Sequence, residues 1–336
     1  MDEYRRTTIE LLRLSDSEID VGSFEAVDDV EMIQIEGGIT NSIVLVRNKR
    51  HGPSVLLKLY GQGSEQFINR TQELDVMQIL SEHKISPRVF ASSSSCRVEE
   101  YLEGFRPLTP TELCSGQFGG EIACSIAQLH KVPLPERYSA SVLAQTLADW
   151  RTKTKAIGLP PGVDASRVDS FISLIHAENQ ASTQCHFLDH TVFSHNDLLS
   201  GNMLWSEEEK RIALIDFEYT SANPAGFDIA NHFCEYPGFE GDMASLYPNE
   251  EFQMRFVGTY LEQRGLPSVE DKNEWRRVLR KLHFYAIASS LWWGLWAVIQ
   301  SASSAIDFNY SEYACSRLGK GINFHSERLE RLGEDA

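Results

Sequence analysis

The stretch from residue 192 to residue 236 constrains this chain most, because several groups of polar residues fall within it. The first group is the run His195-Asn196-Asp197, with Asn202 five positions after the aspartate. The second group is Asp216-Phe217-Glu218, which directly follows the apolar run 212–215. An aspartate that leaves a buried strand, shortly after a loop with an aspartate and an asparagine, restricts both the fold and the chemistry.

These two groups have the spacing of a phosphotransferase core. In kinase-like enzymes an aspartate is followed five positions later by an asparagine, and a second aspartate ends a buried strand. Phosphoryl transfer needs a carboxylate that orients the incoming hydroxyl, and oxygen ligands for the Mg²⁺ that bridges the phosphates. We therefore expect Asp197 to be the catalytic residue, and Asn202 and Asp216 to bind Mg²⁺. Glu218 is a candidate ligand of a second metal ion.

Two short apolar runs between these groups predict a β-hairpin. Residues 204–205 would form one strand and residues 212–215 the other, joined by a turn at 207–210. Such a hairpin would hold Asn202 and Asp216 side by side. The alternative is that these polar side chains cap helices, which is the commoner role of a single loop aspartate. The combination of residues favours the catalytic interpretation.

A third group of polar residues follows and extends the pattern beyond what kinases share. Its members are Asp228, Asn231, His232 and Glu235. The chain now closely resembles the choline/ethanolamine kinase family, a branch of the protein-kinase-like fold. Three segments carry the resemblance, HNDLLSGN (195–202), IDFEY (215–219) and GFDIANHFCEY (226–236). Tyr219, Asp228 and Glu235 match positions specific to that family, and the resemblance covers residues 30–325.

The resemblance implies an α+β fold with two lobes. Residues 1–103 would form a small N-terminal lobe with an antiparallel sheet and one helix at 65–83, preceded by a short helix within residues 1–28. Five runs have the pattern of strands, namely 31–35, 42–46, 54–60, 88–91 and 96–102. Residues 104–336 would form a larger, mostly helical lobe. Its expected helices are 118–130, 143–155, 168–178, 252–264 and 271–302.

The same resemblance assigns ATP contacts in the N-terminal lobe. Thr40 and Asn41 lie in the turn 36–41 of a strand–turn–strand that would cover the phosphates. Lys58 is the only charged residue of an apolar strand and has the place of the lysine that contacts the nucleotide phosphates. Glu73 is its candidate partner. Solvent exposure is the ordinary alternative for both charged residues.

The segment after the last strand would be the hinge between the lobes. In kinase-like folds its backbone groups form hydrogen bonds with the adenine edge. The resemblance places the carbonyl of Glu100 and the amide of Leu102 at these positions. Backbone recognition leaves almost no side-chain pattern, so this expectation depends on the resemblance.

Aromatic residues near the C-terminus are candidates for an amine site. Trp293 and Trp296 lie three apart, on one face of a helix. Phe308 and Tyr313 follow in the segment DFNYSEY (307–313). Such stripes are usually core, and Trp292 is assigned to packing. In the resembled family, however, these aromatic residues line the amino-alcohol site, where ring faces attract an alkylammonium.

Tyr219 and Glu235 would add a ring and a carboxylate to this site. A primary ammonium keeps three donors and needs acceptors such as Glu235, whereas a quaternary ammonium needs only rings and charge. The segments 37–41, 195–199 and 235–238 look like those of ethanolamine kinases. The resemblance thus implies ATP-dependent phosphorylation of ethanolamine to phosphoethanolamine, the first step of the CDP-ethanolamine route to phosphatidylethanolamine. Choline, alone or beside ethanolamine, is the runner-up substrate.

Composition excludes several other classes. The net charge of −17 argues against nucleic acid and against an anionic membrane surface as partners. The apolar run 284–299 is shorter than the ~20 residues that span a bilayer, so we expect a core helix and no membrane span. The six cysteines are scattered, and residues 1–20 lack an apolar signal core, which predicts reduced thiols in a cytoplasmic protein. A homodimer is one candidate for its assembly.

Two further interpretations compete with an amino-alcohol kinase. A pseudokinase would bind nucleotide or amine without turnover, but such proteins typically lose one of Lys58, Asp197, Asn202 or Asp216, all of which are present. A phosphotransferase acting on aminoglycosides would have a similar fold. It would leave the paired tryptophans and the Tyr219 and Glu235 elements unexplained.

Overall fold

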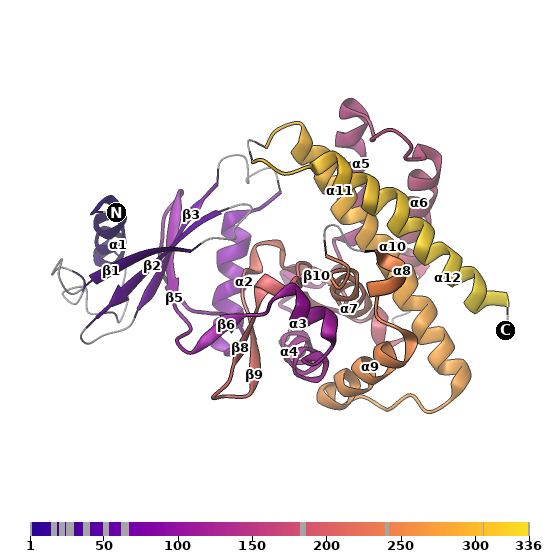
Figure 1. Ribbon diagram of the computed structural model, residues 1–336, viewed down its shortest axis with the longest axis horizontal. Helices are drawn as coiled ribbons and strands as arrows, with labels where there is room; N and C mark the ends of the chain where they lie inside the picture. Colours follow the sequence, from indigo (N-terminus) through magenta and orange to yellow (C-terminus); the bar gives the residue numbers. More distant parts are fainter. Residues whose placement is uncertain are drawn as a thin grey trace. The chain divides into compact units, whose positions relative to one another are not determined.

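The computed structural model divides the chain into two compact units. The first contains Met1–Arg106 and Leu204–Tyr219, and the second contains Pro107–Met203 and Thr220–Ala336. The residues that the structure describes are 2–14, 19, 24, 30–35, 41–49, 54–61, 67–181, 186–238, 242–304 and 306–334. Figure 1 shows the helices and strands of both units, coloured along the sequence.

A five-stranded antiparallel sheet is the main part of the first unit, in the order β1-β2-β3-β5-β4 (Figure 1). Its strands are β1 (Val30–Ile35), β2 (Asn41–Asn48), β3 (Val55–Tyr60), β4 (Val89–Ser92) and β5 (Cys96–Glu100). Val55 and Leu57, two apart on β3, are fully buried, because alternate residues of a strand face the same side. The predicted sheet is confirmed.

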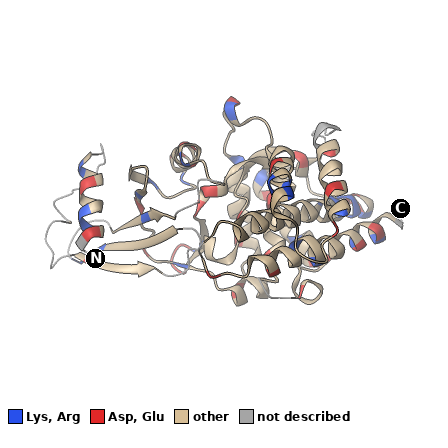
Figure 2. Cartoon of the chain, turned by 90° about the horizontal axis from the view of Figure 1, so that it is seen from above, with Lys and Arg blue, Asp and Glu red and all other residues tan. Residues whose placement is uncertain are grey.

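Two helices accompany this sheet. α1 (Asp2–Leu14) contributes Leu12 to the apolar core of the strands, and acidic and basic residues alternate along it (Figure 2). α2 (Arg70–Glu82) begins later than the predicted residue 65, because Asn69 is its N-cap. The Asn69 side chain accepts a hydrogen bond from the Gln72 N–H at 3.2 Å, which fixes the start of the helix.

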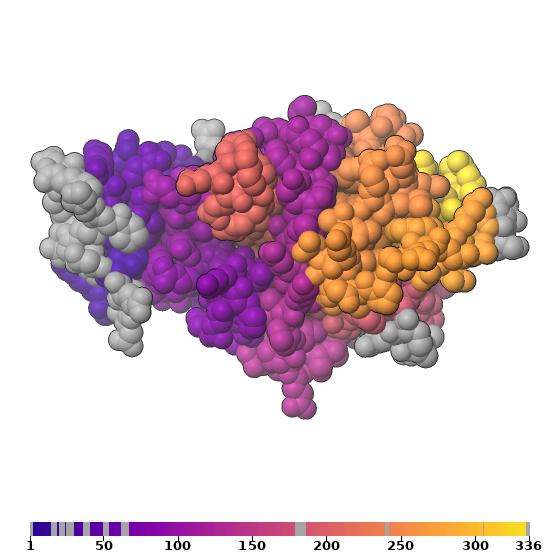
Figure 3. All heavy atoms as spheres, turned by 90° about the horizontal axis from the view of Figure 1, so that it is seen from below, coloured from indigo at the N-terminus to yellow at the C-terminus, as the bar shows by residue number. Residues whose placement is uncertain are grey.

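The predicted hairpin is confirmed. β8 (Met203–Ser206) and β9 (Arg211–Leu214) pair in a three-stranded sheet of order β6-β8-β9, with β6 at Phe105–Pro107. The turn at 207–210 is exposed and lies on the salmon-coloured part of the surface in Figure 3. Beyond β9, a 3-10 turn (η7, Phe217–Tyr219) contacts α2. The division into lobes at residues 1–103 and 104–336 stays a prediction.

The second unit is mostly helical, as predicted. Its helices are α3 (Pro110–Ser115), α4 (Gly119–Lys131), α5 (Leu143–Ile157), α6 (Ala165–Ala181), α7 (Ala225–Cys234), α8 (Met243–Leu246), α9 (Glu250–Arg264), α10 (Lys272–Ser301), α11 (Tyr310–Cys315) and α12 (Ile322–Glu334). Six helices pack against α10, namely α5, α6, α7, α9, α11 and α12 (Figure 1). Five of these were not among the helices predicted from the sequence, namely α3, α7, α8, α11 and α12.

α10 is the core helix of the second unit. By length and composition alone it could cross a membrane, since an 18-residue window has a mean hydropathy of 1.3. However, 94% of that window is buried inside the protein, which fits the predicted core helix. Whether the protein lacks a membrane span stays a prediction.

A short two-stranded ribbon positions the loop 195–202, which contains the predicted catalytic residue Asp197 and which we call the catalytic loop. β7 (Thr191–Ser194) pairs antiparallel with β10 (Ser221–Pro224), so that Ser194 lies opposite Ser221. β7 leads into the loop that starts at His195, and β10 leads into α7. The ribbon therefore brings the start of this loop beside the start of α7.

Candidate active site

Lys58 and Asp216 form a close ion pair in the first unit. The Nζ of Lys58 lies 2.6 Å from Oδ1 of Asp216 and 3.9 Å from Oε2 of Glu218. Burial alone would lower the pKa of Lys58, but the carboxylate of Asp216 raises it above its usual value, with a further contribution from Glu218. The ammonium therefore stays charged. Asp216 has φ of 64°, a conformation that non-glycine residues rarely adopt and that is found at functional sites.

Contrary to the prediction, Glu73 forms ion pairs with two arginines and not with Lys58. Its Oε1 accepts a hydrogen bond from Arg97 at 2.5 Å, and its Oε2 accepts one from Arg70 at 2.7 Å. Arg97 is directly opposite Lys58 in the pairing of β5 with β3, so two cations approach the same region from neighbouring strands. Arg97 forms an ion pair with Glu73, and Lys58 forms one with Asp216. Burial would raise the pKa of Glu73, but the surrounding cations lower it, so the carboxylate stays ionised.

Glu218 is hydrogen-bonded to Asn41, the first residue of β2. Its Oε2 accepts hydrogen bonds from Asn41 at 2.9 Å and from Arg70 at 3.2 Å. Arg70 also donates to the side-chain oxygen of Asn41 at 3.2 Å. Asn41 was predicted to contact ATP, and the structure holds its side chain in place. Thr40, the other predicted residue of this turn, lies outside the described residues.

The carboxylates of this cluster have the chemistry of a site for a divalent cation. Oxygen atoms of Glu73, Asp216 and Glu218 all lie within 4.8 Å of one another. Mg²⁺ prefers such hard oxygen ligands and usually keeps several waters. Asp216 and Glu218 were predicted as metal ligands, and their donor atoms fit that role. Both carboxylate oxygens of Glu73 already form ion pairs, one with Arg97 and one with Arg70.

The two residues predicted to contact the adenine, Glu100 and Leu102, lie at and just after the end of β5. The Glu100 N–H donates to the carbonyl of Arg88 at 2.8 Å, and the Leu102 carbonyl accepts from Phe105 at 3.3 Å. Within the described residues, the Leu102 N–H has no hydrogen-bond acceptor. A free N–H at this position suits the predicted contact with an adenine edge.

Asp228 holds the catalytic loop in the second unit. Its two carboxylate oxygens accept the backbone N–H groups of His195 and Asn196, both at 2.8 Å. His130 also donates to Asp228 at 3.0 Å and lies 2.9 Å from the hydroxyl of Tyr260. Burial would raise the pKa of Asp228, but the hydrogen bond from His130 and the loop N–H groups lower it. Asp228 is thus a fixed anion beneath the loop.

Two more residues of α7 bind the same loop. Asn231 donates to the carbonyl of Asn196 at 2.9 Å, and His232 donates through Nδ1 to the carbonyl of Leu198 at 3.1 Å. Asp228, Asn231 and His232 are three and four positions apart, so they lie on one face of α7. This explains in structural terms the third polar group of the sequence. Asn196 has φ of 67°, which these bonds maintain.

Asp197 and Asn202 face each other across this loop. The amide nitrogen of Asn202 donates to Oδ2 of Asp197 at 2.8 Å and to its carbonyl at 2.9 Å. Asn202 is buried and Asp197 is partly exposed. Because the amide nitrogen of Asn202 is hydrogen-bonded, its side-chain oxygen is left for the predicted role of a neutral metal ligand. Asp197 is oriented by the same bond.

Aromatic residues of α10 and α11 form a cluster in the second unit. The rings of Trp293 and Trp296 are 5.4 Å apart, edge to face. The ring centres of Trp296 and Tyr310 are 5.7 Å apart. The ring centre of Phe308 lies 4.9 Å from that of Tyr310 and 5.8 Å from that of Tyr313. Tyr310 belongs to the segment DFNYSEY (307–313) noted in the sequence, and it joins the other rings into one cluster.

Trp292 and Glu235 are two further residues of the second unit whose roles were predicted from the sequence. Trp292 packs against Trp150 and Phe227, which confirms its assignment to the core. Glu235 follows α7 directly and accepts a short hydrogen bond from Arg317. We call Glu235, Trp293, Trp296, Phe308 and Tyr313 the candidate amine pocket. Tyr219, the remaining predicted substrate residue, is buried in η7 of the first unit.

Three arginines of these sites were missed by sequence reasoning, namely Arg70, Arg97 and Arg317. Arg97 had a readable signal, because it is a charge inside the strand CRVEE, whose flanking residues Cys96 and Val98 are buried. Arg70 and Arg317 each have a local partner at helical spacing, Glu73 and Tyr313. Their partners Glu218 and Glu235 lie 148 and 82 positions away, so only the folded chain reveals these contacts.

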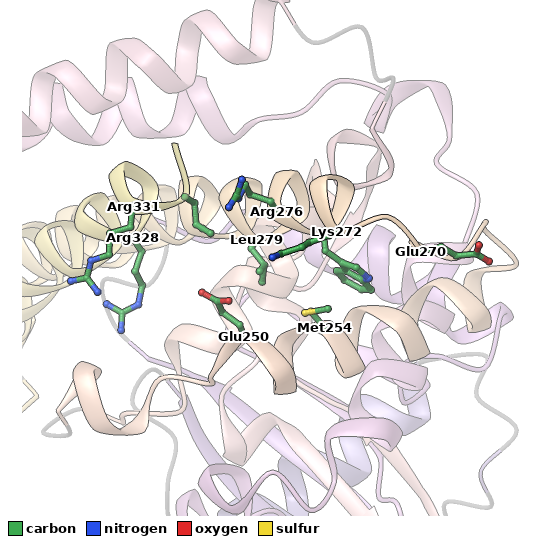
Figure 4. Close-up of a pocket in the computed structure, with 10 residues that line it drawn as sticks. Glu250, Met254, Glu270, Lys272, Arg276, Leu279, Arg328 and Arg331 are labelled. Atoms are coloured by element: carbon green, nitrogen blue, oxygen red, sulfur yellow. The ribbon is translucent and has the colours of Figure 1, made fainter. Parts of the chain in front are cut away.

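A separate pocket of about 690 Å³ opens on the second unit between α9, the start of α10 and α12 (Figure 4). Its lining residues are Glu250, Met254, Glu270, Lys272, Trp275, Arg276, Leu279, Arg328, Arg331 and Leu332. None of the residues predicted for catalysis, ATP, metal or amine binding lines it. This pocket is therefore no part of the candidate active site.

Comparison with known proteins agrees with this geometry. The profile of the family described as Choline/ethanolamine kinase matches residues 32–320. An Arabidopsis thaliana protein named probable choline kinase 2 is 32% identical over 299 residues, which are 86% of this chain and 83% of that protein. Another from the same organism, named probable ethanolamine kinase, is 32% identical over 287 residues, 83% of this chain and 75% of its own length.

A solved structure supports the same assignment. A Plasmodium vivax ethanolamine kinase superposes with a TM-score of 0.78 at 25% identity, covering 90% of this chain and 85% of that chain. The expected protein-kinase-like fold is thereby confirmed. Since the family profile spans most of the sequence and relatives align along most of it, this chain is a kinase that belongs to the choline/ethanolamine kinase family.

Proposed function

We propose that this kinase transfers the γ-phosphoryl group of ATP to the hydroxyl of ethanolamine. The observation that carries the proposal is the catalytic loop, where Asp197 and Asn202 are bonded to each other above the fixed anion of Asp228. The same unit contains the candidate amine pocket. A loop of this kind together with an aromatic cluster and a carboxylate suits an alkylammonium substrate that carries a hydroxyl.

Asp197 would accept the proton of the substrate hydroxyl as the oxygen attacks the phosphorus. The hydrogen bond from Asn202 orients the carboxylate for that task, and partial exposure lets a substrate reach it. Positioning and proton acceptance by such a group typically contribute about 10²–10⁴ in rate. Asp197 is therefore the residue on which turnover should depend most.

Asp216 and Asn202 would hold Mg²⁺, with Glu218 as a candidate ligand of a second ion. When bound, the metal neutralises phosphate charge during transfer. Lys58 supplies a permanent ammonium beside Asp216, and it would contact the phosphates of ATP. Asn41, fixed by Glu218 and Arg70, would help to cover them.

The preference for ethanolamine is supported by the chemistry of Glu235. A primary ammonium donates three hydrogen bonds, whereas the quaternary group of choline donates none. Glu235 offers a carboxylate oxygen for such a donor, and the rings of Trp293 and Trp296 offer cation–π contact to either amine. Phosphoethanolamine would then enter phospholipid synthesis. Choline is the second candidate, because the aromatic cluster also fits a quaternary ammonium.

The experiment that tests this function is a turnover assay. The purified protein is incubated with radiolabelled ATP, Mg²⁺ and separate amines, namely ethanolamine, choline, serine and an aminoglycoside. We expect labelled phosphoethanolamine as the main product, and its loss in Asp197→Asn. Phosphorylation of the aminoglycoside alone, or ATP binding without any product, would contradict the proposal.

A further inference from the structure

Arg317 connects two members of the candidate amine pocket, although no motif in the sequence marks it. One guanidinium nitrogen, Nη2, donates to Oε1 of Glu235 in a short hydrogen bond. Another, Nε, donates to the hydroxyl oxygen of Tyr313 at 3.0 Å. The guanidinium carbon also lies 5.2 Å from the centre of the Tyr313 ring. A single cation thus fixes a carboxylate and a ring of the same pocket.

This ion pair is enclosed by the protein. The side chain of Arg317 is 7% exposed and that of Glu235 is 10% exposed. Burial alone would lower the pKa of Arg317, but Tyr313 and Glu235 raise it, so the guanidinium is permanently charged. Buried pairs of this kind depend on both partners, because removing one leaves an uncompensated charge. The position of Glu235 is therefore tied to Arg317.

Glu235 keeps one oxygen for another donor. Arg317 engages Oε1, and within the described residues no donor reaches Oε2. A carboxylate held by one oxygen cannot rotate freely, so the second oxygen has a set direction. An ammonium group that binds there meets an acceptor already in place, which lowers the entropy lost on binding.

The local chain conformation brings Arg317 against the tryptophans. Residues Ser316–Gly321 form a π-helical turn, a rare feature that is frequent at functional sites. Gly294, which lies between the two tryptophans in sequence, packs against this turn. A Cβ at Gly294 would come within 3.3 Å of the Cβ of Arg317 and 2.5 Å of the Cγ of Leu318. The absence of a side chain at Gly294 allows this approach.

We propose that Arg317 is a positioning residue for the amine substrate, which fixes the acceptor oxygen of Glu235 and the ring of Tyr313 before the ammonium group binds. This inference deepens the proposed function and rests on it, because it requires that the pocket binds an amino alcohol. Arg317 itself does not touch the amine, since two like charges would repel. Its effect on the substrate passes through Glu235 and Tyr313.

Arg317→Lys separates charge from geometry. Lysine keeps the positive charge near Glu235, but its single ammonium lacks the planar fork that bonds two partners in fixed directions. Tyr313→Phe is the matched second variant. It keeps the ring and the Arg317–Glu235 pair and removes only the oxygen that accepts the hydrogen bond from Nε.

The test measures equilibrium amine binding by tryptophan fluorescence, with ethanolamine and choline as probes, in the full chain. In Arg317→Lys we expect the Kd for ethanolamine to rise about tenfold or more, the scale of one lost charge-assisted bond. The KM for ATP should stay within twofold. Tyr313→Phe should raise the Kd about two- to threefold with little change in the urea unfolding midpoint.

A purely structural role for Arg317 predicts a different pattern. Arg317→Lys would then lower the unfolding midpoint and leave the amine Kd of the folded protein within twofold, which would overturn the inference. If Arg317→Lys does not fold, an unchanged Kd in Tyr313→Phe would overturn it instead. Turnover by the wild-type protein is scored separately. A wild type that binds amines but transfers no phosphate overturns the proposed function only, and one that binds no amine overturns both.

Discussion

The indole N–H of Trp293 donates a hydrogen bond to Oδ1 of Asn231 at 2.9 Å. The amide nitrogen of Asn231 in turn donates to the backbone carbonyl of Asn196 at 2.9 Å. A single buried amide therefore joins the tryptophan of the candidate amine pocket to the backbone of the catalytic loop. The rings that would receive the amine and the aspartate that would activate its hydroxyl share this support.

The first prediction concerns Asn231. Asn231→Asp keeps the acceptor for Trp293 but replaces the donor to Asn196 with an oxygen, so the loop loses a hydrogen bond at a residue of positive φ. An unsatisfied buried polar group costs about 1–3 kcal/mol. We expect kcat to fall about tenfold or more. Ser289→Ala, which removes only a second donor to the same Oδ1, is the matched control and should retain most of the activity. Equal losses in both variants would refute a specific link to the loop.

The second prediction concerns Asp197, the proposed catalytic base. Asp197→Asn keeps the shape of the side chain and should leave the unfolding midpoint and the KM for ATP nearly unchanged. Turnover should fall about 10²–10⁴-fold, because a positioned proton acceptor is lost. Steady-state kinetics with ethanolamine measure this. A variant that keeps a third or more of the wild-type kcat would remove Asp197 from the mechanism.

The third prediction concerns the metal. Asp216→Ala should abolish activity at any attainable Mg²⁺ concentration, since it removes a charged ligand and the partner of Lys58. Asn202→Ala should be partly rescued by more Mg²⁺ or by Mn²⁺, because only a neutral oxygen is lost. Activity is titrated against each metal in both variants. The same metal dependence as the wild type in both would contradict the ligand assignment.

The fourth prediction concerns the pH dependence of stability. Burial lowers the pKa of His283 to about 3 and that of His232 to about 4. Each folded pKa lies below the unfolded value, so the neutral ring is favoured on folding. Its stabilising effect is complete above about pH 6.5 and is lost as the pH falls toward the folded pKa.

Between pH 7.5 and pH 5.5 each of these histidines should therefore reduce the free energy of unfolding by about 1.4 kcal/mol. Urea unfolding at the two pH values measures the total. The variant His283→Asn has no titrating side chain at this position. Its free energy of unfolding should therefore fall by about 1.4 kcal/mol less between the two pH values. A variant with the same pH dependence as the wild type would count against this assignment.

Local patterns in the sequence were enough to predict much of the fold. The strand β3 is a short apolar run around Lys58, and the hairpin β8–β9 has two apolar runs joined by a charged turn. The long apolar run of α10 predicted a core helix. In each case the information is contained within a few consecutive residues, so periodicity alone reveals it.

Features that depend on distant partners were beyond the sequence. The ribbon β7–β10 pairs two four-residue segments, TVFS and SANP, and no pattern in the sequence indicates that Ser221 lies opposite Ser194. The expected Lys58–Glu73 pair was wrong because Arg97, from the neighbouring strand, takes Glu73 instead. The catalytic roles of Asp197 and Asn202 could be proposed because their spacing is local. The support of Glu235 by Arg317 crosses 82 positions and could not.

The measurement that tests the account most directly is the ratio of kcat/KM for ethanolamine to kcat/KM for choline, with both amines competing in one reaction. We predict that ethanolamine is favoured in the wild type, because Glu235 accepts a hydrogen bond that only a primary ammonium can donate. Trp296→Ala should widen this preference, since choline depends more on ring faces. A wild-type ratio in favour of choline, or a ratio that Trp296→Ala moves toward choline, would contradict the account.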